Sequence, residues 1–202
     1  MLDLVADECR RIDSRFLEPA CGDGNFLIEV LRRKLAVVAE RHAPTTRRRD
    51  RRGWERDAII AVTSLYGIEL LSDNVAACRD RLATAFNDEY GRLFPNAAED
   101  STGPAVRASV CHILSLNVVC GDALSFLRPD GTPIILPEWS PVNGTMLKRR
   151  DFRFDHLLKQ ADIGSRPLFS DLGEEVYLPE PVADHPPVHY LKLSRKLVQN
   201  DC

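Results

Sequence analysis

The sequence has no long apolar run. None of its 202 residues lie in a stretch that approaches the ~18 consecutive apolar positions of a membrane helix. The N-terminal segment MLDLVADECRRI carries acidic residues within its apolar pattern, which excludes a secretory signal peptide. We therefore expect a cytoplasmic protein that makes no contact with a membrane.

The six cysteines include no CxxC pair, and several of them stand in apolar runs. This pattern is typical of reduced thiols in the core of a cytosolic protein rather than of a disulfide framework. No metal site is expected, because His185 and His189 stand four residues apart without a cysteine or third ligand beside them. The formal net charge of −3 argues against general polyanion binding, although local basic patches are still open to that role.

Two common nucleotide-binding signatures are also missing. The chain has neither the complete GxGxxG of dinucleotide-binding folds nor the GK[ST] of a P-loop. A nucleotide-binding oxidoreductase is therefore disfavoured. What the sequence does contain is 44% apolar and 28% charged residues. That composition supports a packed core, and the length suits one domain with a small appendage.

Apolar periodicity predicts an alternation of helices and strands as far as residue 127. The expected elements are a helix over 2–13, a strand ending at Pro19, a helix from Asn25 to Arg41, a helix and strand ending at Glu69, a helix over 72–90 capped by Ser72 or Asp73, a loop over 91–107, and a helix and strand ending at Cys120. This order favours an α/β fold, a parallel sheet with helices on both faces. We expect residues 1–127 to form that domain.

The sequence changes character after residue 127. Nine of the 13 prolines follow residue 128. The segments TPIILPEWSPV, DFRFDHLL and EEVYLPEPV predict short strands or hairpins joined by turns. We expect residues 128–202 to form a proline-rich, β-rich or irregular C-terminal region.

The stretch EPACGDGNFL, residues 18–27, joins the first predicted strand to the first long helix. Gly22 and Gly24 would let a ligand approach the backbone where a side chain would not fit. The helix after them presents unpaired N–H groups and the positive end of its dipole, which suit an anionic or carboxylate-bearing ligand. Two acids follow the next two strands, Glu69 in YGIEL and Asp122 in VVCGDAL.

Together, EPACGDGNFL, YGIEL and VVCGDAL resemble the first three cofactor motifs of the class I S-adenosylmethionine-dependent methyltransferases. The likeness is greatest to the adenine-N6 DNA methyltransferases of restriction-modification and phage-defence systems, and it spans about residues 1–127. It implies a Rossmann-like methyltransferase sheet, S-adenosyl-L-methionine as the cofactor, and DNA as the substrate.

The resemblance also implies which residues would hold the cofactor. The loop around Asp23 would pass close to its methionine part, and Glu18 would act on its amino end. Glu69 would accept hydrogen bonds from both ribose hydroxyls, and Asp122 would accept one from the adenine amine. The expected cofactor-binding residues are Glu18, Pro19, Ala20, Cys21, Gly22, Asp23, Gly24, Asn25, Phe26, Glu69, Leu70, Asp122, Ala123 and Leu124.

The fourth motif of that family, Asn-Pro-Pro-Tyr or a close variant, has no recognisable copy here. In the family its polar residue accepts the amine protons and its ring stacks on a flipped base. In the expected place stands EWSPVNGT, where Trp139 and Asn143 are the candidate catalytic residues. The one Pro-Pro pair lies farther along, in DHPPVHY, with His185 in the place of the acceptor. The alternative for both segments is a proline-stiffened loop.

Two basic segments leave alternatives open. TTRRRDRR, residues 45–52, is either a solvated loop or an arm that contacts phosphates. KRRDFRF, residues 148–154, either lines a nucleic-acid groove or forms a half-buried strand with a basic outer face.

Two functions remain open on the sequence. In the first, the chain is an S-adenosylmethionine-dependent DNA (adenine-N6) methyltransferase domain of a restriction-modification or phage-defence system. In the second, it is a catalytically inactive, cofactor-binding subunit with a structural or regulatory role. The extra residues that usually recognise the DNA target are absent from the sequence. The chain is then a fragment of a longer system, a subunit that relies on partners, or a cofactor-binding remnant. DNA is the expected partner, contacted directly or through other subunits, and a protein partner is a candidate source of target recognition.

Overall fold

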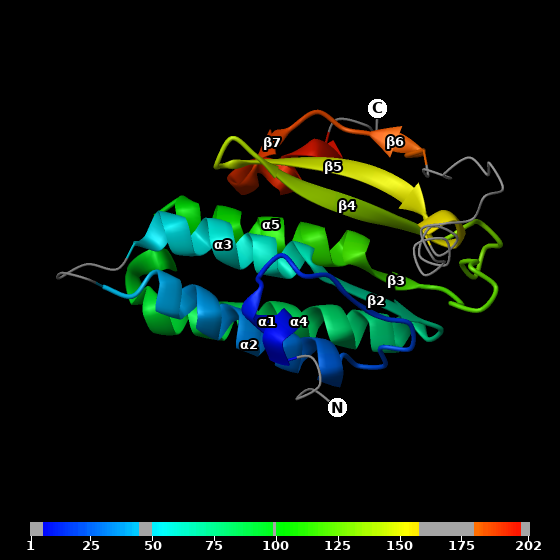
Figure 1. The fold of residues 1–202 in the computed structure, drawn as a ribbon, viewed down its shortest axis with the longest axis horizontal. Coiled ribbons are helices and arrows are strands. Elements are labelled where there is room, and N and C mark those ends of the chain that lie inside the picture. The colour runs from blue at the N-terminus through cyan, green and yellow to red at the C-terminus, as the bar shows by residue number, and fades with distance from the viewer. Residues whose placement is uncertain (1–5, 45–49, 99, 158–179, 199–202) are drawn as a thin grey trace, which may run out of the picture.

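The computed structural model describes residues 6–44, 50–98, 100–157 and 180–198, which form a mixed α/β fold (Figure 1). Its elements are α1 (Ala6–Arg10), β1 (Phe16–Glu18), α2 (Asn25–Arg41), α3 (Arg51–Thr63), β2 (Leu65–Glu69), α4 (Ser72–Leu93), η2 (Pro95–Ala98), α5 (Thr102–Asn117), β3 (Val118–Cys120), β4 (Ile135–Val142), β5 (Met146–Arg153), β6 (Ala183–Asp184), β7 (Val188–His189) and η3 (Tyr190–Val198).

The first sheet is parallel and three-stranded, in the order β1-β2-β3. Phe16 pairs with Leu65, and Gly67 pairs with Val118. Helices α3 and α5 run almost without a break into β2 and β3, so helix and strand share one layer (Figure 1). Helices α2 and α4 lie below that layer, and β4 and β5 lie above it (Figure 1). The predicted parallel α/β sheet is confirmed at this level.

Helices α2 and α4 form where apolar residues recur at helical spacing. The predicted bounds of α2, Asn25 to Arg41, are those of the structure. In α4 the expected stripe is fully buried; it consists of Val75, Cys78, Leu82 and Phe86. Burying each of these larger apolar side chains stabilises the fold by roughly 1.5–3 kcal/mol. The predicted cap is wrong, because Leu71 is the N-cap residue and no side chain caps the helix.

The loop predicted over 91–107 is largely wrong. Helix α4 continues to Leu93, η2 follows, and α5 already begins at Thr102. The early start of α5 has a local cause, since Asp100 Oδ1 accepts the N–H groups of Thr102 at 2.9 Å and Gly103 at 3.1 Å. A carboxylate in that place satisfies two donors of the first helical turn. The polar composition of residues 91–107 predicted a loop and gave no indication of this cap.

The second sheet is antiparallel and is built around the β4–β5 hairpin. Eight residues of β4 pair with eight of β5, from Ile135 opposite Arg153 to Val142 opposite Met146. The turn at Asn143 and Gly144 has φ values of 48° and 75°. The connection has three residues, because Val142 pairs with Met146, and positive φ is a conformation that asparagine and glycine adopt more readily than other residues. This sheet lies within the region predicted to be β-rich or irregular, residues 128–202, of which the structure describes 128–157 and 180–198.

The expectation of helices on both faces of the parallel sheet needs correction. One face carries Phe16, Leu65 and Val118, which pack in the same core as α2 and α4. The opposite face carries Tyr66, Ile68 and Val119. In the described part of the chain, these three pack mainly against Ile134, Leu136 and Phe154, at the ends of the β4–β5 hairpin. The alternation of helices and strands before residue 127 gave no sign of that cover.

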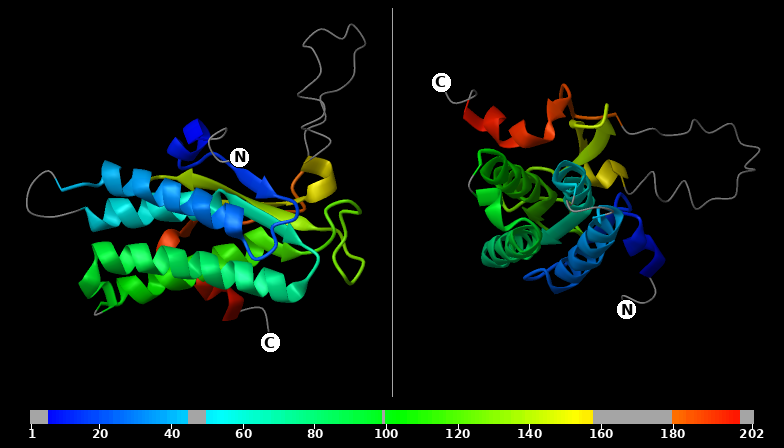
Figure 2. Two further views of the ribbon diagram at one scale, coloured as in Figure 1. Left: turned by 90° about the horizontal axis from the view of Figure 1, so that it is seen from below. Right: turned by 90° about the vertical axis from the view of Figure 1, so that its left-hand side faces the viewer.

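The hydrophobic core crosses residue 127. The cluster that contains the inner faces of α2 to α5 also contains four C-terminal residues, Trp139, Leu147, Tyr190 and Leu193. The end-on view in Figure 2 shows the four helices grouped together, with the C-terminal strands and η3 against them. The change in composition at residue 127 thus marks a change of secondary structure within a shared core.

Candidate functional site

The carboxyl ends of the three parallel strands meet at one edge of the sheet. The Cys21 N–H donates to the Ile68 carbonyl at 3.0 Å, and the Gly121 N–H donates to the Glu69 carbonyl at 2.9 Å. These two bonds continue the ladder beyond the strands. They bring the glycine turn, the end of β2 and the loop after β3 to the same edge, as the parallel arrangement predicted.

The two glycines of the turn have different surroundings. Gly24 has φ +91°, and a Cβ there would lie 2.6 Å from the Cys78 Sγ, so the packing of α4 by itself requires this glycine. Gly22 has φ +52°, and nothing lies within 4 Å of the position of its Cβ. Gly22 therefore faces open space, where a ligand could approach the backbone.

Glu69 connects the turn to the first residues of α4. Its Oε2 accepts the Gly22 N–H at 2.9 Å, and its Oε1 accepts the Leu71 N–H at 3.1 Å. The Asn74 amide donates to the same Oε1 at 3.4 Å. The N–H of Leu71 is the largest cause that lowers the pKa of Glu69, and that of Gly22 adds to it. The carboxylate is thus held ionised beside Gly22, and its three donors leave about one acceptor position, on Oε2.

Asp122 begins a tight turn after β3. Its Oδ1 accepts the Leu124 N–H at 2.9 Å, and its own N–H donates to the Leu127 carbonyl at 2.8 Å. The bond from Leu124 is the first of the causes that lower the pKa of this carboxyl group, and Ser125 adds to it. Asp122 is ionised and accessible, and its position is fixed by backbone hydrogen bonds.

Large apolar side chains at this edge are exposed. Leu70 is 66% exposed and Leu124 is 89% exposed. Leu71 and Leu127 are exposed as well. A flat apolar ligand between the end of β2 and the loop after β3 would cover part of this surface. Leu71 and Leu127 were not among the predicted residues, although each is a leucine close to a predicted acid.

Asp23 is paired with an arginine of α4. Arg81 contacts the Asp23 carboxylate at 2.5 Å and donates to its carbonyl at 2.9 Å. Arg81 also donates to Asn25 Oδ1 at 2.8 Å, and the Asn25 amide donates to Asp23 Oδ1 at 2.8 Å. These contacts fix the shape of the turn. Arg81 was not among the predicted residues; the signal for it is a basic residue at the tenth position of the helix that follows Glu69.

The other predicted cofactor residues surround the turn. Glu18 is half-buried, and within the described residues its carboxylate has no hydrogen-bonding partner. Pro19 and Ala20 are exposed and Cys21 is buried. Phe26 packs against Phe16 with a ring-centroid distance of 6.3 Å. Ala123 packs against the smaller core cluster on the other face of the sheet.

The candidate catalytic residues Trp139 and Asn143 are not brought to this edge. Trp139 is buried in the core, where its indole N–H donates to Asn117 Oδ1 at 2.9 Å. Asn143 is exposed in the β4–β5 turn, which lies at the opposite end of the molecule from the carboxyl ends of β2 and β3 (Figure 1). Eight strand residues, at about 3.3 Å each, carry the chain roughly 25 Å from the start of β4 to that turn.

The segment KRRDFRF forms most of β5, which favours the half-buried strand. Phe152 and Phe154 are buried. The basic residues have acidic partners nearby, as Arg149 contacts Asp151 at 2.8 Å and Arg150 contacts Glu138 at 2.5 Å. In DHPPVHY, His185 contacts the same Asp151 at 2.9 Å.

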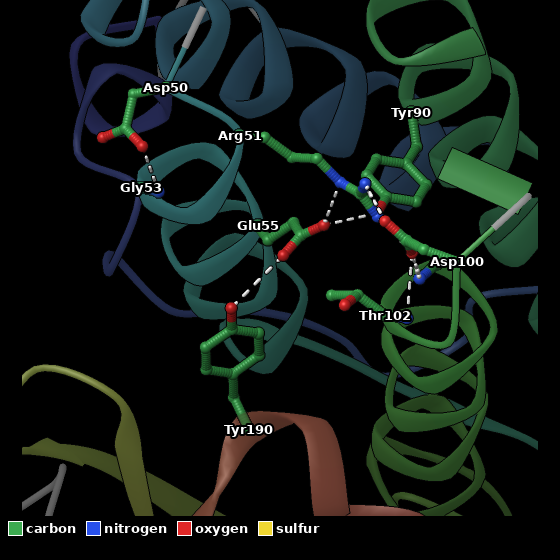
Figure 3. Close-up of polar contacts among 9 residues, drawn as sticks. Asp50, Arg51, Gly53, Glu55, Tyr90, Asp100, Thr102 and Tyr190 are labelled. Carbon is green, nitrogen blue, oxygen red and sulfur yellow. Dashed lines mark hydrogen bonds and ion pairs between the residues drawn. The ribbon is translucent and has the colours of Figure 1, made fainter. Parts of the chain in front are cut away.

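Most of TTRRRDRR lies outside the described residues. Its last three residues, Asp50 to Arg52, are described. Asp50 caps α3 by accepting the Gly53 N–H at 3.0 Å, and Arg51 belongs to a polar network around the buried Glu55 (Figure 3). Arg51 Nε donates to Glu55 at 2.7 Å, and its Nη1 contacts Asp100 at 2.6 Å. Tyr90 donates to the same Glu55 carboxylate, and Tyr190 donates to its other oxygen at 3.2 Å. The network joins α3, α4, η3 and the residue that caps α5.

Glu55 is fully buried, with 0% of its side chain exposed. Both of its oxygens are occupied by donors from side chains of the protein. The pKa of Asp100 is lowered to about 2, chiefly by its hydrogen bond from Arg51. Burial raises the pKa of Tyr190 to about 12, so both tyrosines remain donors at neutral pH. This arrangement holds elements together and leaves no room for a substrate.

No group of three potential metal ligands occurs within the described ranges. Nor does any helix of this part of the chain combine the length and apolar character needed to span a membrane. No protein-family model, curated protein or solved structure matches the chain.

Proposed function

We propose that the chain is an S-adenosyl-L-methionine-binding domain of the methyltransferase class, with the cofactor at the carboxyl edge of the parallel sheet. One observation carries the proposal: the ionised Glu69 is hydrogen-bonded to the N–H of Gly22, beside the open space in front of that glycine. This hydrogen bond brings Gly22 of EPACGDGNFL and Glu69 of YGIEL, the first two motifs that resemble the methyltransferases, together in one site.

The residues at this edge fit such a cofactor. Glu69 would accept a ribose hydroxyl at the acceptor position left on Oε2, and Asp122 would accept the adenine amine. Leu70 and Leu124 would cover the faces of the ring, because both are exposed beside these acids. Glu18, whose carboxylate has no partner in the described residues, would accept the amino group of the methionine part. When bound, the cofactor supplies a methyl group on a sulfonium centre.

The activity proposed for this domain is methylation of DNA at adenine N6, in a restriction-modification or phage-defence complex. The protein must then hold an adenine amine in line with the methyl group and accept its proton. Trp139 and Asn143 do not serve that purpose in the observed fold. The acceptor groups and the DNA target recognition would come from a partner chain or from residues outside the described ranges.

A second candidate function is favoured by the position of Trp139. Its indole is in the core and bonded to Asn117, as described above, so the segment in place of the fourth motif contributes to stability. The chain would then be a cofactor-binding subunit without transfer activity, and its assembly with partners would respond to the cofactor.

Calorimetric titration with S-adenosylmethionine tests cofactor binding, which both candidate functions require. We compare the wild type with Asp122→Asn and with Asp130→Asn as a matched control. Asp130 is an exposed aspartate whose Oδ1 accepts the Thr132 N–H at 2.9 Å, in the same local geometry as Asp122 and Leu124. Each substitution removes one charge from a similar turn, but only Asp122 belongs to the site.

We expect Asp122→Asn to weaken binding at least tenfold, which corresponds to about 1.4 kcal/mol, and Asp130→Asn to leave it unchanged. A folded wild type that does not bind S-adenosylmethionine would overturn the proposal. If binding is found, transfer of labelled methyl to DNA, with and without candidate partner chains, separates the two functions.

A further inference from the structure

A phenylalanine in the turn after β3 has an unusual backbone conformation. Phe126 has a φ of 63°, in the left-handed region that bulky residues rarely adopt. Glycine or asparagine would occupy this position with less strain. A strained residue persists only where its surroundings stabilise it. Phe126 stands four residues after Asp122 of the candidate site, so whatever stabilises Phe126 also bears on that site.

The backbone of Phe126 closes the turn that contains Asp122. The Phe126 N–H donates to the Asp122 carbonyl at 2.8 Å, and the Asp122 N–H donates to the carbonyl of the next residue, Leu127, at 2.8 Å. Both backbone groups of Asp122 are thus fixed by residues 126 and 127. The direction of the Asp122 side chain depends on these bonds, because it leaves the same stretch of backbone.

The ring of Phe126 packs on the end of the β4–β5 hairpin. It meets the ring of Phe154 edge-on, with a centroid distance of 5.6 Å and an interplanar angle of 69°. It also packs against the cluster of buried residues that covers the second face of the parallel sheet. Burial of the ring and the edge-to-face contact are both favourable. They counteract the strain of the backbone at Phe126.

Backbone hydrogen bonds join the same two regions. The Phe154 N–H donates to the Ile134 carbonyl at 2.9 Å, and the Ile134 N–H donates to the Phe126 carbonyl at 2.8 Å. The Ile134 side chain also lies against Gly121, where a Cβ would be 2.7 Å from the Ile134 Cδ1. A continuous series of hydrogen bonds therefore runs from the end of β5 to Asp122.

We propose that Phe126 is a positioning residue for Asp122: it transmits the docking of the β4–β5 hairpin to this carboxylate, and it thereby sets the preference of the site for a ligand with an adenine amine. The proposal rests on the function proposed above, because Asp122 meets an amine only if the ligand carries adenine. The packing of the hairpin on the turn does not depend on that function.

An inosine analogue of the ligand isolates the contribution of Asp122. Adenine carries an amine that donates to a carboxylate, whereas hypoxanthine carries in the same place a carbonyl oxygen that repels one. A site that holds an acceptor in a fixed position therefore rejects the inosine compound. An acceptor that turns away discriminates less between the two. The ratio of the two affinities thus reports how firmly Asp122 is held.

The test measures the binding of S-adenosylhomocysteine and S-inosylhomocysteine by calorimetry to the wild type, Phe154→Leu and Phe152→Leu. Phe154 is 3% exposed, so its side chain does not reach the ligand. Phe152 is the matched control. It is a phenylalanine of β5 with 6% exposure, and its ring lies 5.7 Å from the Arg150 guanidinium carbon. Amide hydrogen exchange at Asp122 and Phe126 is followed in the same three proteins without ligand.

We expect the wild type to prefer the adenosine compound about tenfold and Phe154→Leu to lower this preference about threefold or more. Phe152→Leu should keep the wild-type preference. Amide exchange at Asp122 and Phe126 should be faster in Phe154→Leu alone. Phe126→Asn is a second variant, since asparagine tolerates the left-handed conformation but lacks the ring. It should lower the preference as Phe154→Leu does.

An unchanged preference in Phe154→Leu and Phe126→Asn would overturn the proposal, as would an equal loss in Phe152→Leu. A wild type that binds both compounds equally would overturn it as well. If the wild type binds neither compound, the function proposed above fails. Faster exchange confined to Phe154→Leu would then still support the positioning of the turn by the hairpin, and unchanged exchange would reject it.

Discussion

Carboxylates gather at both ends of the helical layer, but they are used differently. At the carboxyl edge of the sheet, Glu69 and Asp122 accept backbone N–H groups and stay accessible beside exposed leucines. At the opposite end, Glu55 is fully buried and accepts from Arg51, Tyr90 and Tyr190. Glu69 and Glu55 each accept three donors from the protein, so the two carboxylates differ in exposure. Glu69 is only partly buried and can be reached by a ligand, whereas the Glu55 side chain has no exposed surface.

This difference separates the candidate binding site from a structural network on physical grounds. A buried charge is tolerated when other groups satisfy every lone pair, and such a group cannot turn to a ligand without a large cost. An exposed carboxylate held by backbone donors loses little when a ligand replaces water at its other lone pairs. We therefore expect substitutions at the two ends to affect different measurements.

The largest effect is expected at Glu55. Glu55→Ala removes the acceptor shared by Arg51, Tyr90 and Tyr190 from a fully buried position. We expect the free energy of unfolding to fall by about 4 kcal/mol, as measured by urea denaturation. The control is Glu89→Ala, which removes an acid paired with Arg92 at the surface and should cost less than about 1 kcal/mol. Equal losses in both variants would show that burial of Glu55 has no special importance.

The two glycines of the turn provide a sharper comparison. Gly24→Ala places a methyl group 2.6 Å from Cys78 Sγ at φ +91°, so we expect a loss of roughly 3 kcal/mol in stability. Gly22→Ala meets no atom within 4 Å, and its φ of +52° costs only about 1 kcal/mol. Its main effect should be on affinity, with S-adenosylmethionine binding at least tenfold weaker by calorimetry. Wild-type affinity in Gly22→Ala would mean that the open space is not used.

The smallest effect is expected from pH. Backbone N–H groups lower the pKa values of Glu69 and Asp122 below their ordinary range. A carboxylate with a lowered pKa in the folded state stabilises the fold above its ordinary value, and this contribution is lost only as the pH falls through the lowered value. Both groups thus stay ionised at pH 5. We expect S-adenosylmethionine affinity to be constant from pH 8 to pH 5 in calorimetric titrations; a decline centred near pH 6 would contradict ionised acceptors.

The helices and strands before residue 90 were predictable because their signals are local. Apolar residues at helical spacing gave α2 its bounds, and the stripe from Val75 to Phe86 is buried as expected. The segment after residue 90 was not predictable in this way. The start of α5 depends on Asp100, which is held by Arg51 from a helix 49 positions earlier. A cap that depends on a distant partner has no local signature.

The glycines and acids of the candidate site were predictable, because they stand at the ends of strands that the sequence predicts to be parallel. Glycines after one strand and acids after the next two meet because parallel strands bring their carboxyl ends together. Trp139 and Asn143 illustrate the limit. Their residue types suit a base-stacking and proton-accepting role, but an Asn-Gly turn and a long antiparallel hairpin place them elsewhere. Sequence spacing after β3 could not distinguish these outcomes.

The sequence by itself determined the alternating elements, the parallel sheet and the acids and glycines at its edge, because each depends on neighbouring residues or on strand direction. Only the tertiary structure decided which residues that are far apart in the sequence become neighbours. It placed Arg81 on Asp23, Arg51 on Asp100, and the hairpin on the second face of the sheet. The physical reason is that burial and pairing depend on the packing of whole layers, which no local pattern of residues encodes.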